Sequence, residues 1–302
     1  MQSLSDPARQ AMLSRVTHLD VQRAVTIMTI ATSSVGILGF LLGGQLEHWG
    51  VATVLLVQSA LFALGLFAVA LLPPLPPIGA PSAPGALASL AAGLRATAAV
   101  PLVRNMISLN FLSSLFNAGA YIVVVPYILS EVYGGGAGAL AQAMIVFTLG
   151  SIASNLLLLR YMPLLHPGRL WLLMQLTRMV ILGLIYLEPA PLLFDLLLVA
   201  WGVNMGVTTT LVRTTVQELA PPAQRAGVLS ILLFSFMVSS PVSALLLGIV
   251  ISSSSPTVAL LPGIAVSAVI FALGAGLSGL WQYRSAAADR SPAPPGPDPA
   301  SE

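Results

Sequence analysis

The chain has 302 residues, of which 57% are hydrophobic and only 7% are charged, and its mean hydropathy is +0.93. A soluble domain carries about 25% charged residues, so this composition excludes an ordinary soluble protein and predicts an integral membrane protein. The absence of cysteine excludes disulfides, zinc–thiolate sites and cysteine nucleophiles. The net charge of +2 comes from twelve scattered arginines and no lysine, a distribution that argues against a nucleic-acid partner.

Eight apolar runs follow one another along the chain, after a polar segment, residues 1–23, that shows no secretory leader. As helices, rising roughly 1.5 Å per residue, the runs can each cross a hydrocarbon layer of about 30 Å. Their ranges are 25–46, 51–72, 106–130, 140–159, 170–187, 192–212, 228–251 and 258–280. The sequence therefore predicts an all-α, polytopic membrane protein with eight transmembrane helices.

The arginines predict the orientation of these helices. Eleven of the twelve lie in the N-terminal segment, in every second connection or in the C-terminal tail, and the other connections contain none. By the positive-inside rule, we expect these connections and both termini to lie in the cytoplasm, with the chain in the cell membrane. Residues 73–85 are rich in proline and predict a linker, followed by a short interfacial helix at 86–97. Residues 285–302 predict a disordered tail.

A short internal repeat suggests that the chain is built from related halves. Gln22-Arg23-Ala24 opens the first run and Gln224-Arg225-Ala226 opens the seventh, so six spans separate the copies. This spacing is typical of two-bundle transporters made of six-helix halves. On this interpretation, four helices of the first bundle have no counterpart in the chain.

Three segments resemble the major facilitator superfamily, and within it the enterobactin-exporter-like efflux branch. Asp6-Pro7-Ala8-Arg9-Gln10-Ala11 is similar to the loop between helices four and five of that branch. Gly36-Ile37-Leu38-Gly39-Phe40 with Gly43-Gly44 is similar to its helix five, although Phe40 replaces the usual proline. Gln217-Glu218-Leu219-Ala220-Pro221, followed by Arg225, is similar to its loop between helices ten and eleven.

The resemblance implies an incomplete two-bundle fold that contains helices five to twelve. Residues 1–72 would then hold a cytoplasmic loop and the last two helices of an N-terminal bundle. Residues 73–104 would be the cytoplasmic linker with its interfacial helix, and residues 105–284 would form a complete six-helix C-terminal bundle. Residues 285–302 would be the tail.

One charged residue lies in the middle of an apolar run, where a charge costs roughly 2.5–3.5 kcal/mol on insertion scales. This residue is Arg178, and the nearest carboxylate within a span is Asp195, in the following run. If the two helices are antiparallel neighbours, the two residues differ in depth by roughly five residues, or about 7.5 Å. We therefore expect an Arg178–Asp195 pair. This pair could contact an anionic substrate, switch between conformational states, or be a fixed structural pair. By the resemblance, the helix that contains Arg178 is number nine, which is peripheral.

Two polar stripes indicate candidate substrate contacts. The stripe at 106–130 contains Asn110, Ser113, Ser114, Asn117 and Tyr121, and the one at 192–212 contains Trp201, Asn204 and Thr208. Helical spacing puts each set on one face. By the resemblance, the two helices are numbers seven and ten, which line the central path. The stripes could bind substrate or join helices by hydrogen bonds. The stripes Thr148, Ser151, Asn155 and Ser235, Ser239, Ser243 favour packing.

The sequence gives little support for an enzymatic function. The chain has no GxGxxG, no P-loop and no nucleophile elbow, and its three histidines lie at or outside the ends of the runs, so we expect no cofactor and no metal site. The predicted function is secondary transport, the export of small organic molecules by alternating access. The expected partners are a small-molecule substrate and the lipid bilayer, and a proton is the candidate coupling ion, with Asp195 as its carrier. The alternative is a truncated, transport-inactive remnant or a membrane-embedded partner subunit.

Overall fold

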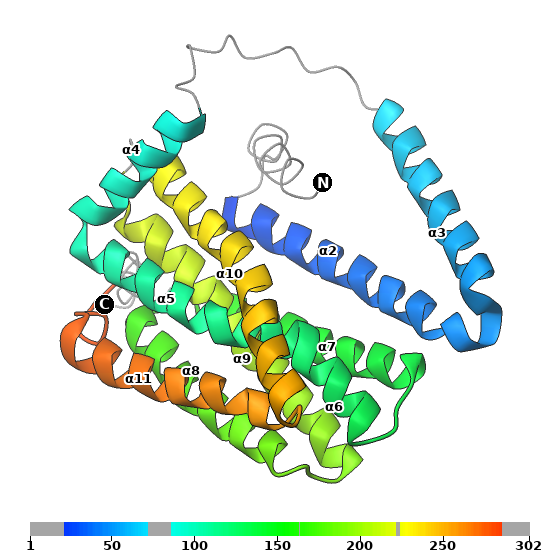
Figure 1. Ribbon diagram of the computed structural model, residues 1–302. Helices are drawn as coiled ribbons and strands as arrows, with labels where there is room; N and C mark the ends of the chain where they lie inside the picture. Colours follow the sequence, from blue (N-terminus) through cyan, green and yellow to red (C-terminus); the bar gives the residue numbers. More distant parts are fainter. Residues whose placement is uncertain (1–20, 72–85, 163, 222–223, 286–302) are drawn as a thin grey trace, which may run out of the picture.

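The computed structural model describes residues 21–71, 86–162, 164–221 and 224–285, and all regular structure in these ranges is helical (Figure 1). The predicted linker at 73–85, the tail beyond residue 285 and the segment Asp6–Ala11 lie outside the described residues. The helices are α2 (Val21–Gly44), α3 (Leu46–Ala70), α4 (Ala86–Ala99), α5 (Pro101–Gly119), the π-helical turn η1 (Ala120–Val124), α6 (Val125–Glu131), α7 (Ala137–Tyr161), α8 (Pro167–Tyr186), α9 (Pro191–Leu219), α10 (Arg225–Ser253), the 3-10 turn η2 (Val258–Leu260) and α11 (Leu261–Leu277).

Each of the eight predicted runs is a helix, and α4 forms where the short helix was predicted. Within the described residues, seven helical segments are long and apolar enough to cross a membrane. The described apolar part of the remaining one, α2, is shorter and covers Ala31–Gly44. The prediction of an all-α polytopic membrane protein is thereby confirmed.

Proline and glycine set several helix boundaries. Pro101, Pro167 and Pro191 occupy the first turns of α5, α8 and α9, where the missing N–H has no helical partner to lose. Gly50 has a φ of 73°, a left-handed conformation that glycine adopts without a steric penalty. It interrupts the start of α3, so the regular part of this helix begins where the sequence predicts the second run, at residue 51.

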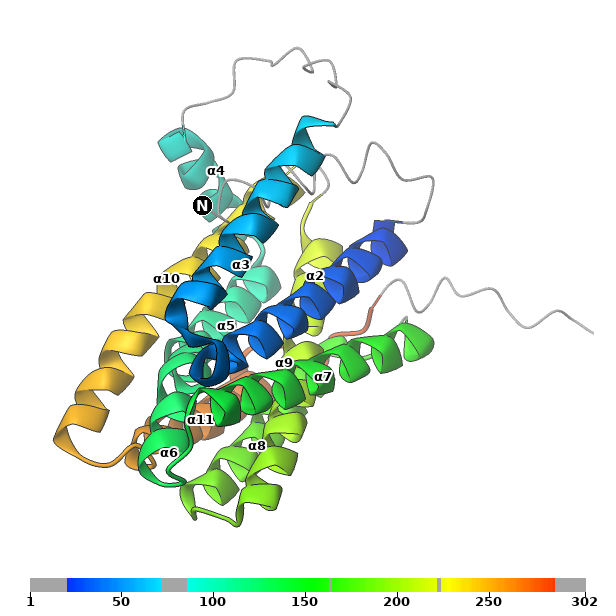
Figure 2. The same cartoon turned by 90° about the vertical axis from the view of Figure 1, so that its right-hand side faces the viewer.

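The helices from α5 to α11 pack into one bundle, in which α7 lies along α9, α5 along α10, and α8 between α9 and α11 (Figures 1 and 2). Helix α2 packs against α7, and α4 packs against α10. Within the described residues, α3 packs lightly, mainly against α2 and α7, and it stands apart from the bundle in Figure 1. Its apolar side chains are exposed, as expected for a helix covered by lipid.

Long-range hydrogen bonds show which connections between helices lie at the same end of the bundle. At one end, the amide of Asn105 donates to the Ser278 carbonyl and the Ser285 hydroxyl donates to Glu218. At the opposite end, the Tyr133 hydroxyl donates to the Pro189 carbonyl and the Thr257 hydroxyl donates to Glu188. The first end carries the arginine-bearing connections, and the second carries the connections without arginine, as the predicted alternation requires.

Tyrosines at both ends of the bundle have raised pKa values. Burial raises the pKa of Tyr283 above its usual range, and the hydrogen bond with Glu218 and its negative charge raise it further. Burial also raises the pKa of Tyr133, and the charge of Glu188 adds to this effect. Both pKa shifts favour the protonated, hydrogen-bond-donating form of the tyrosine.

Candidate functional site

A belt of buried polar side chains separates two apolar clusters inside the bundle. One cluster includes Ile181, Leu182 and Trp201, and the other includes Leu172 and Val207. Between them, α8 contributes Gln175 and Arg178, α9 contributes Asn204 and Thr208, and α5 contributes Ser113. Each of these side chains is at most 4% exposed. A hydrogen-bonded belt of this kind is the arrangement that polar groups require at membrane depth.

Arg178 is the centre of this belt. Its Nε donates to Asn204 Oδ1 at 3.1 Å, and its guanidinium nitrogens donate to the hydroxyls of Ser113 at 2.6 Å and Thr208 at 3.3 Å. A longer bond of 3.4 Å joins it to Gln175 Oε1. The Asn204 amide in turn donates to the Met174 carbonyl and the Thr177 hydroxyl, both at 2.7 Å. Arg178 therefore ties α8 to α5 and α9.

The predicted pair between Arg178 and Asp195 is not formed. Asp195 is half-buried and accepts a hydrogen bond of 2.6 Å from the Gln142 amide of α7. The reason lies in side-chain direction, because helical side chains lean toward the N-terminus of their helix. Arg178 leans toward the start of α8, whereas Asp195 leans toward the α8–α9 turn, so the two groups point apart along the bundle.

The polar stripe of α5 is divided between different neighbours. The Asn117 amide donates to the Ser113 carbonyl at 2.7 Å, and its Oδ1 lies near Gly263 of α11. Asn110 is buried one turn before Ser113. Ser114 and Tyr121 are half-buried instead. Of the predicted substrate contacts, Asn110, Asn117, Asn204 and Thr208 thus lie within the bundle, and Ser114 and Tyr121 are the more accessible ones.

Three aromatic rings come together from three helical segments at the end of this stripe. The Tyr121 ring stacks on Phe147 of α7, with centroids 4.0 Å apart and an interplanar angle of 24°. Trp201 of α9 meets both rings edge-on, at 6.4 Å and 6.0 Å. We call Tyr121, Phe147 and Trp201 the aromatic cluster. Phe40 of α2 packs against the same apolar core, so α2 lies beside this part of the bundle.

The π-helical turn η1 carries Tyr121 to this cluster. A π-turn inserts one extra residue into the helix and rotates the residues after it about the helix axis. The Gly119 N–H, at its start, donates to Ser243 Oγ of α10 at 2.8 Å. Tyr121 therefore faces α7 and α9, whereas Asn117, one turn earlier, faces α11.

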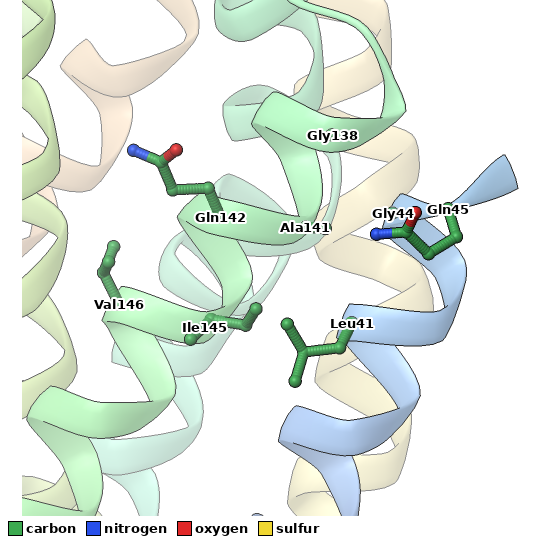
Figure 3. Close-up of a pocket in the computed structure, with 8 residues that line it drawn as sticks. All are labelled: Leu41, Gly44, Gln45, Gly138, Ala141, Gln142, Ile145 and Val146. Atoms are coloured by element: carbon green, nitrogen blue, oxygen red, sulfur yellow. The ribbon is translucent and has the colours of Figure 1, made fainter. Parts of the chain in front are cut away.

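A small cavity of about 230 Å³ lies between the end of α2 and the start of α7 (Figure 3). In Figure 3, Leu41 and Ile145 face each other across it, whereas the amide of Gln142 points away from α2. That amide is the one bound to Asp195. The cavity is lined by Leu41, Gly44, Gln45, Gly138, Ala141, Gln142, Ile145 and Val146.

Helices α7 and α9 approach each other at backbone distance. A methyl group added at Gly202 would overlap the Phe147 carbonyl oxygen, and one at Gly150 would overlap the Val199 carbonyl oxygen. Farther along, the Thr210 hydroxyl donates to Asn155 Oδ1 at 2.6 Å. The stripe that contains Asn155 thus serves helix packing, as predicted.

Sequence reasoning missed two members of these groups. Gln175 precedes Arg178 by three residues and is a polar residue in an apolar run, which was a usable signal. Phe147 gave no signal, because an aromatic residue in an apolar span is ordinary.

Comparison with known proteins identifies the family. The sequence model of the Major Facilitator Superfamily matches residues 1–244, most of the chain. A search of curated proteins and a search of solved structures each gave no match. The matched region covers the aromatic cluster and Arg178 with all its partners. The chain therefore belongs to the Major Facilitator Superfamily, a family of membrane transporters.

Proposed function

We propose that this chain is a secondary transporter that exports small organic molecules by alternating access. The observation that carries the proposal is the aromatic cluster. Tyr121, Phe147 and Trp201 come from three different spans, and Tyr121 remains half-exposed beside them. Aromatic faces bind flat apolar groups by offset stacking and edge contacts. Ser114, about two helical turns before Tyr121, supplies a half-buried hydroxyl on the same span.

The substrate class follows from this surface. Stacking rings and a hydroxyl suit a planar molecule with few polar groups. Arg178 is engaged by four neutral partners inside the bundle, which removes it from direct contact with a large substrate. We therefore assign substrate contact to Tyr121 and Ser114, and a supporting role to Trp201, Asn204 and Thr208.

Efflux of a planar aromatic fluorescent dye from preloaded cells tests this assignment. Tyr121→Ala should lower the energy-dependent efflux rate by roughly two- to tenfold, because a stacking contact is worth about 0.5–1.5 kcal/mol. Tyr121→Phe keeps the ring and should keep most of the rate.

The matched control is Tyr127→Ala, which removes a tyrosine ring that is 46% exposed on the neighbouring helix α6. It should leave efflux unchanged. Equal losses in Tyr121→Ala and Tyr127→Ala would contradict substrate contact at Tyr121. A wild-type chain that exports no member of a panel of planar compounds would refute transport and favour a membrane-embedded partner subunit.

We further propose a proton as the coupling ion and Asp195 as its carrier. The carboxylate is half-buried within a span and bonded to a neutral amide, so it can accept a proton without breaking an ion pair. Asp195→Asn should abolish the acceleration of efflux by an imposed pH gradient, whereas Asp195→Glu should retain it. Glu131→Gln, at an exposed carboxylate near the same end, is the control and should not alter the response. An intact pH response in Asp195→Asn would exclude this carboxylate.

The orientation that we propose puts the arginine-bearing end in the cytoplasm of a cell membrane. The positive-inside rule supports it, since Arg104, Arg160 and Arg169 lie in terminal turns at that end. Single cysteines introduced at Gly134 and at His166 should react with an impermeant thiol reagent from opposite sides of the membrane. Labelling of both from one side would contradict the topology.

A further inference from the structure

Four helices enclose Arg178. Helix α5 contacts α9 and α11, and α8 contacts the same two helices, so the four form a closed ring. The arginine crosses this ring from α8 to reach Ser113 on α5. Its side chain is 3% exposed. The guanidinium is therefore held in the interior of the bundle and away from lipid.

Among the described residues, no carboxylate bonds to this guanidinium. All four of its hydrogen-bond partners in the described structure are neutral: one amide oxygen each from Asn204 and Gln175, and two hydroxyls. Neutral dipoles solvate a buried cation only in part, and removing an ion from water still costs several kcal/mol. Arginine cannot escape this cost by losing its proton.

Unused hydrogen-bond donors lie in the same ring. Arg178 can only donate, so Gln175 must present its oxygen to it, which leaves the Gln175 Nε2 without a partner. The Asn110 Nδ2 and the Ser267 hydroxyl also have no partner. Gln175 and Ser267 are fully buried, and Asn110 is 6% exposed. Buried groups of this kind are normally satisfied, so three unsatisfied donors on the helices around Arg178 require an explanation.

The helix register brings these donors to the level of the arginine. Gln175 and Asn110 each lie one turn before a member of the network, Arg178 and Ser113 respectively. On α11, Gly263 lies against Leu182 and Gly274 lies against Leu172. Ser267 lies between these two contacts and therefore faces the part of α8 that contains Arg178. The donors come from α5, α8 and α11, which are three sides of the ring.

We propose that this ring binds a small monovalent anion, with chloride as the physiological form. Asn117 Oδ1 on α5 is also without a partner, so a water molecule could satisfy hydrogen bonds here, but only an anion also neutralises the charge of Arg178. The close packing of the four helices selects a single atom over a polyatomic anion. The bound ion would neutralise Arg178 and satisfy Gln175, Asn110 and Ser267. This inference does not depend on transport activity, since it requires only that the bundle is folded.

Thermal unfolding of the purified full chain in detergent tests the proposal. The wild type should show a Tm roughly 2–4 °C higher in sodium chloride than in sodium gluconate of equal ionic strength. Sodium bromide should act like chloride. Equal Tm values in chloride, bromide and gluconate would overturn the proposal.

The variant Ser267→Ala tests whether the anion binds beside this hydroxyl. The hydroxyl has no protein partner, so its removal costs no protein hydrogen bond and should not lower the Tm in gluconate. With an anion bound, the same change removes a donor and should raise the chloride concentration for half-maximal stabilisation roughly tenfold. Ser235→Ala, whose hydroxyl donates to the Leu232 carbonyl of α10, outside the ring, is the control and should leave the chloride dependence unchanged.

Gln175→Glu supplies a fixed negative charge at the position of the unused donor. The variant should be at least as stable as the wild type in gluconate and should have lost its response to chloride. An unchanged chloride response in both Ser267→Ala and Gln175→Glu would show that the stabilising anion binds elsewhere, and would overturn this assignment.

Discussion

Gly202→Ala is expected to separate α7 from α9 and to destabilise the protein by roughly 1–3 kcal/mol, the usual cost of overpacking. The added methyl group has no space, because the Phe147 carbonyl already occupies its position. A backbone oxygen cannot change rotamer, so the helices themselves must shift. The Tm of the purified protein should fall by several degrees, and Gly202→Leu should prevent accumulation of folded protein.

Gly183→Ala is the matched control, since a methyl group at Gly183 in α8 meets no atom within 4 Å. It should leave the Tm unchanged or raise it slightly, because alanine has the higher helix propensity. A similar Tm for both variants would mean that α7 and α9 do not approach each other as closely as described.

Asn204→Leu is expected to have the largest effect, a loss of roughly 3–5 kcal/mol. The leucine takes the acceptor of the Arg178 Nε away and leaves the buried charge with fewer partners. It also removes the donor that the Met174 carbonyl and the Thr177 hydroxyl share. The amount of monodisperse protein after detergent extraction and the Tm of the remainder measure this loss.

Thr209→Leu, a half-buried position on the same helix, controls for the general cost of a larger side chain. We expect it to be tolerated. If Asn204→Leu were tolerated equally well, the hydrogen bonds around Arg178 would contribute little to the stability of the bundle.

The fold could be predicted from the sequence because bilayer thickness and arginine spacing constrain it strongly. Eight apolar runs became eight helices, and proline marked where several of them begin. Helix ends were less accurate, as for α9, which continues to Leu219 rather than to residue 212. The last turns there are polar, and hydropathy does not distinguish a polar helical extension from a loop.

The candidate site could be predicted only in part from the sequence, for two physical reasons. Spacing in sequence places residues on a common face, but the π-turn at Ala120–Val124 rotates Tyr121 away from the side that Asn117 faces. Sequence position gives the membrane depth of the Cα atoms of Arg178 and Asp195, whereas the direction of the side chains decides which groups meet. The second error was avoidable, since this lean is the same in all α-helices.

The glycine contacts between α7 and α9 have a consequence for motion. Two helices whose backbones touch cannot slide along each other without passing through a steric clash at every turn. Any change of shape during a transport cycle must therefore move α7 and α9 as a single rigid body. Sliding between helices has to occur where they pack less closely, such as between α2 and α7, which enclose a cavity of about 230 Å³.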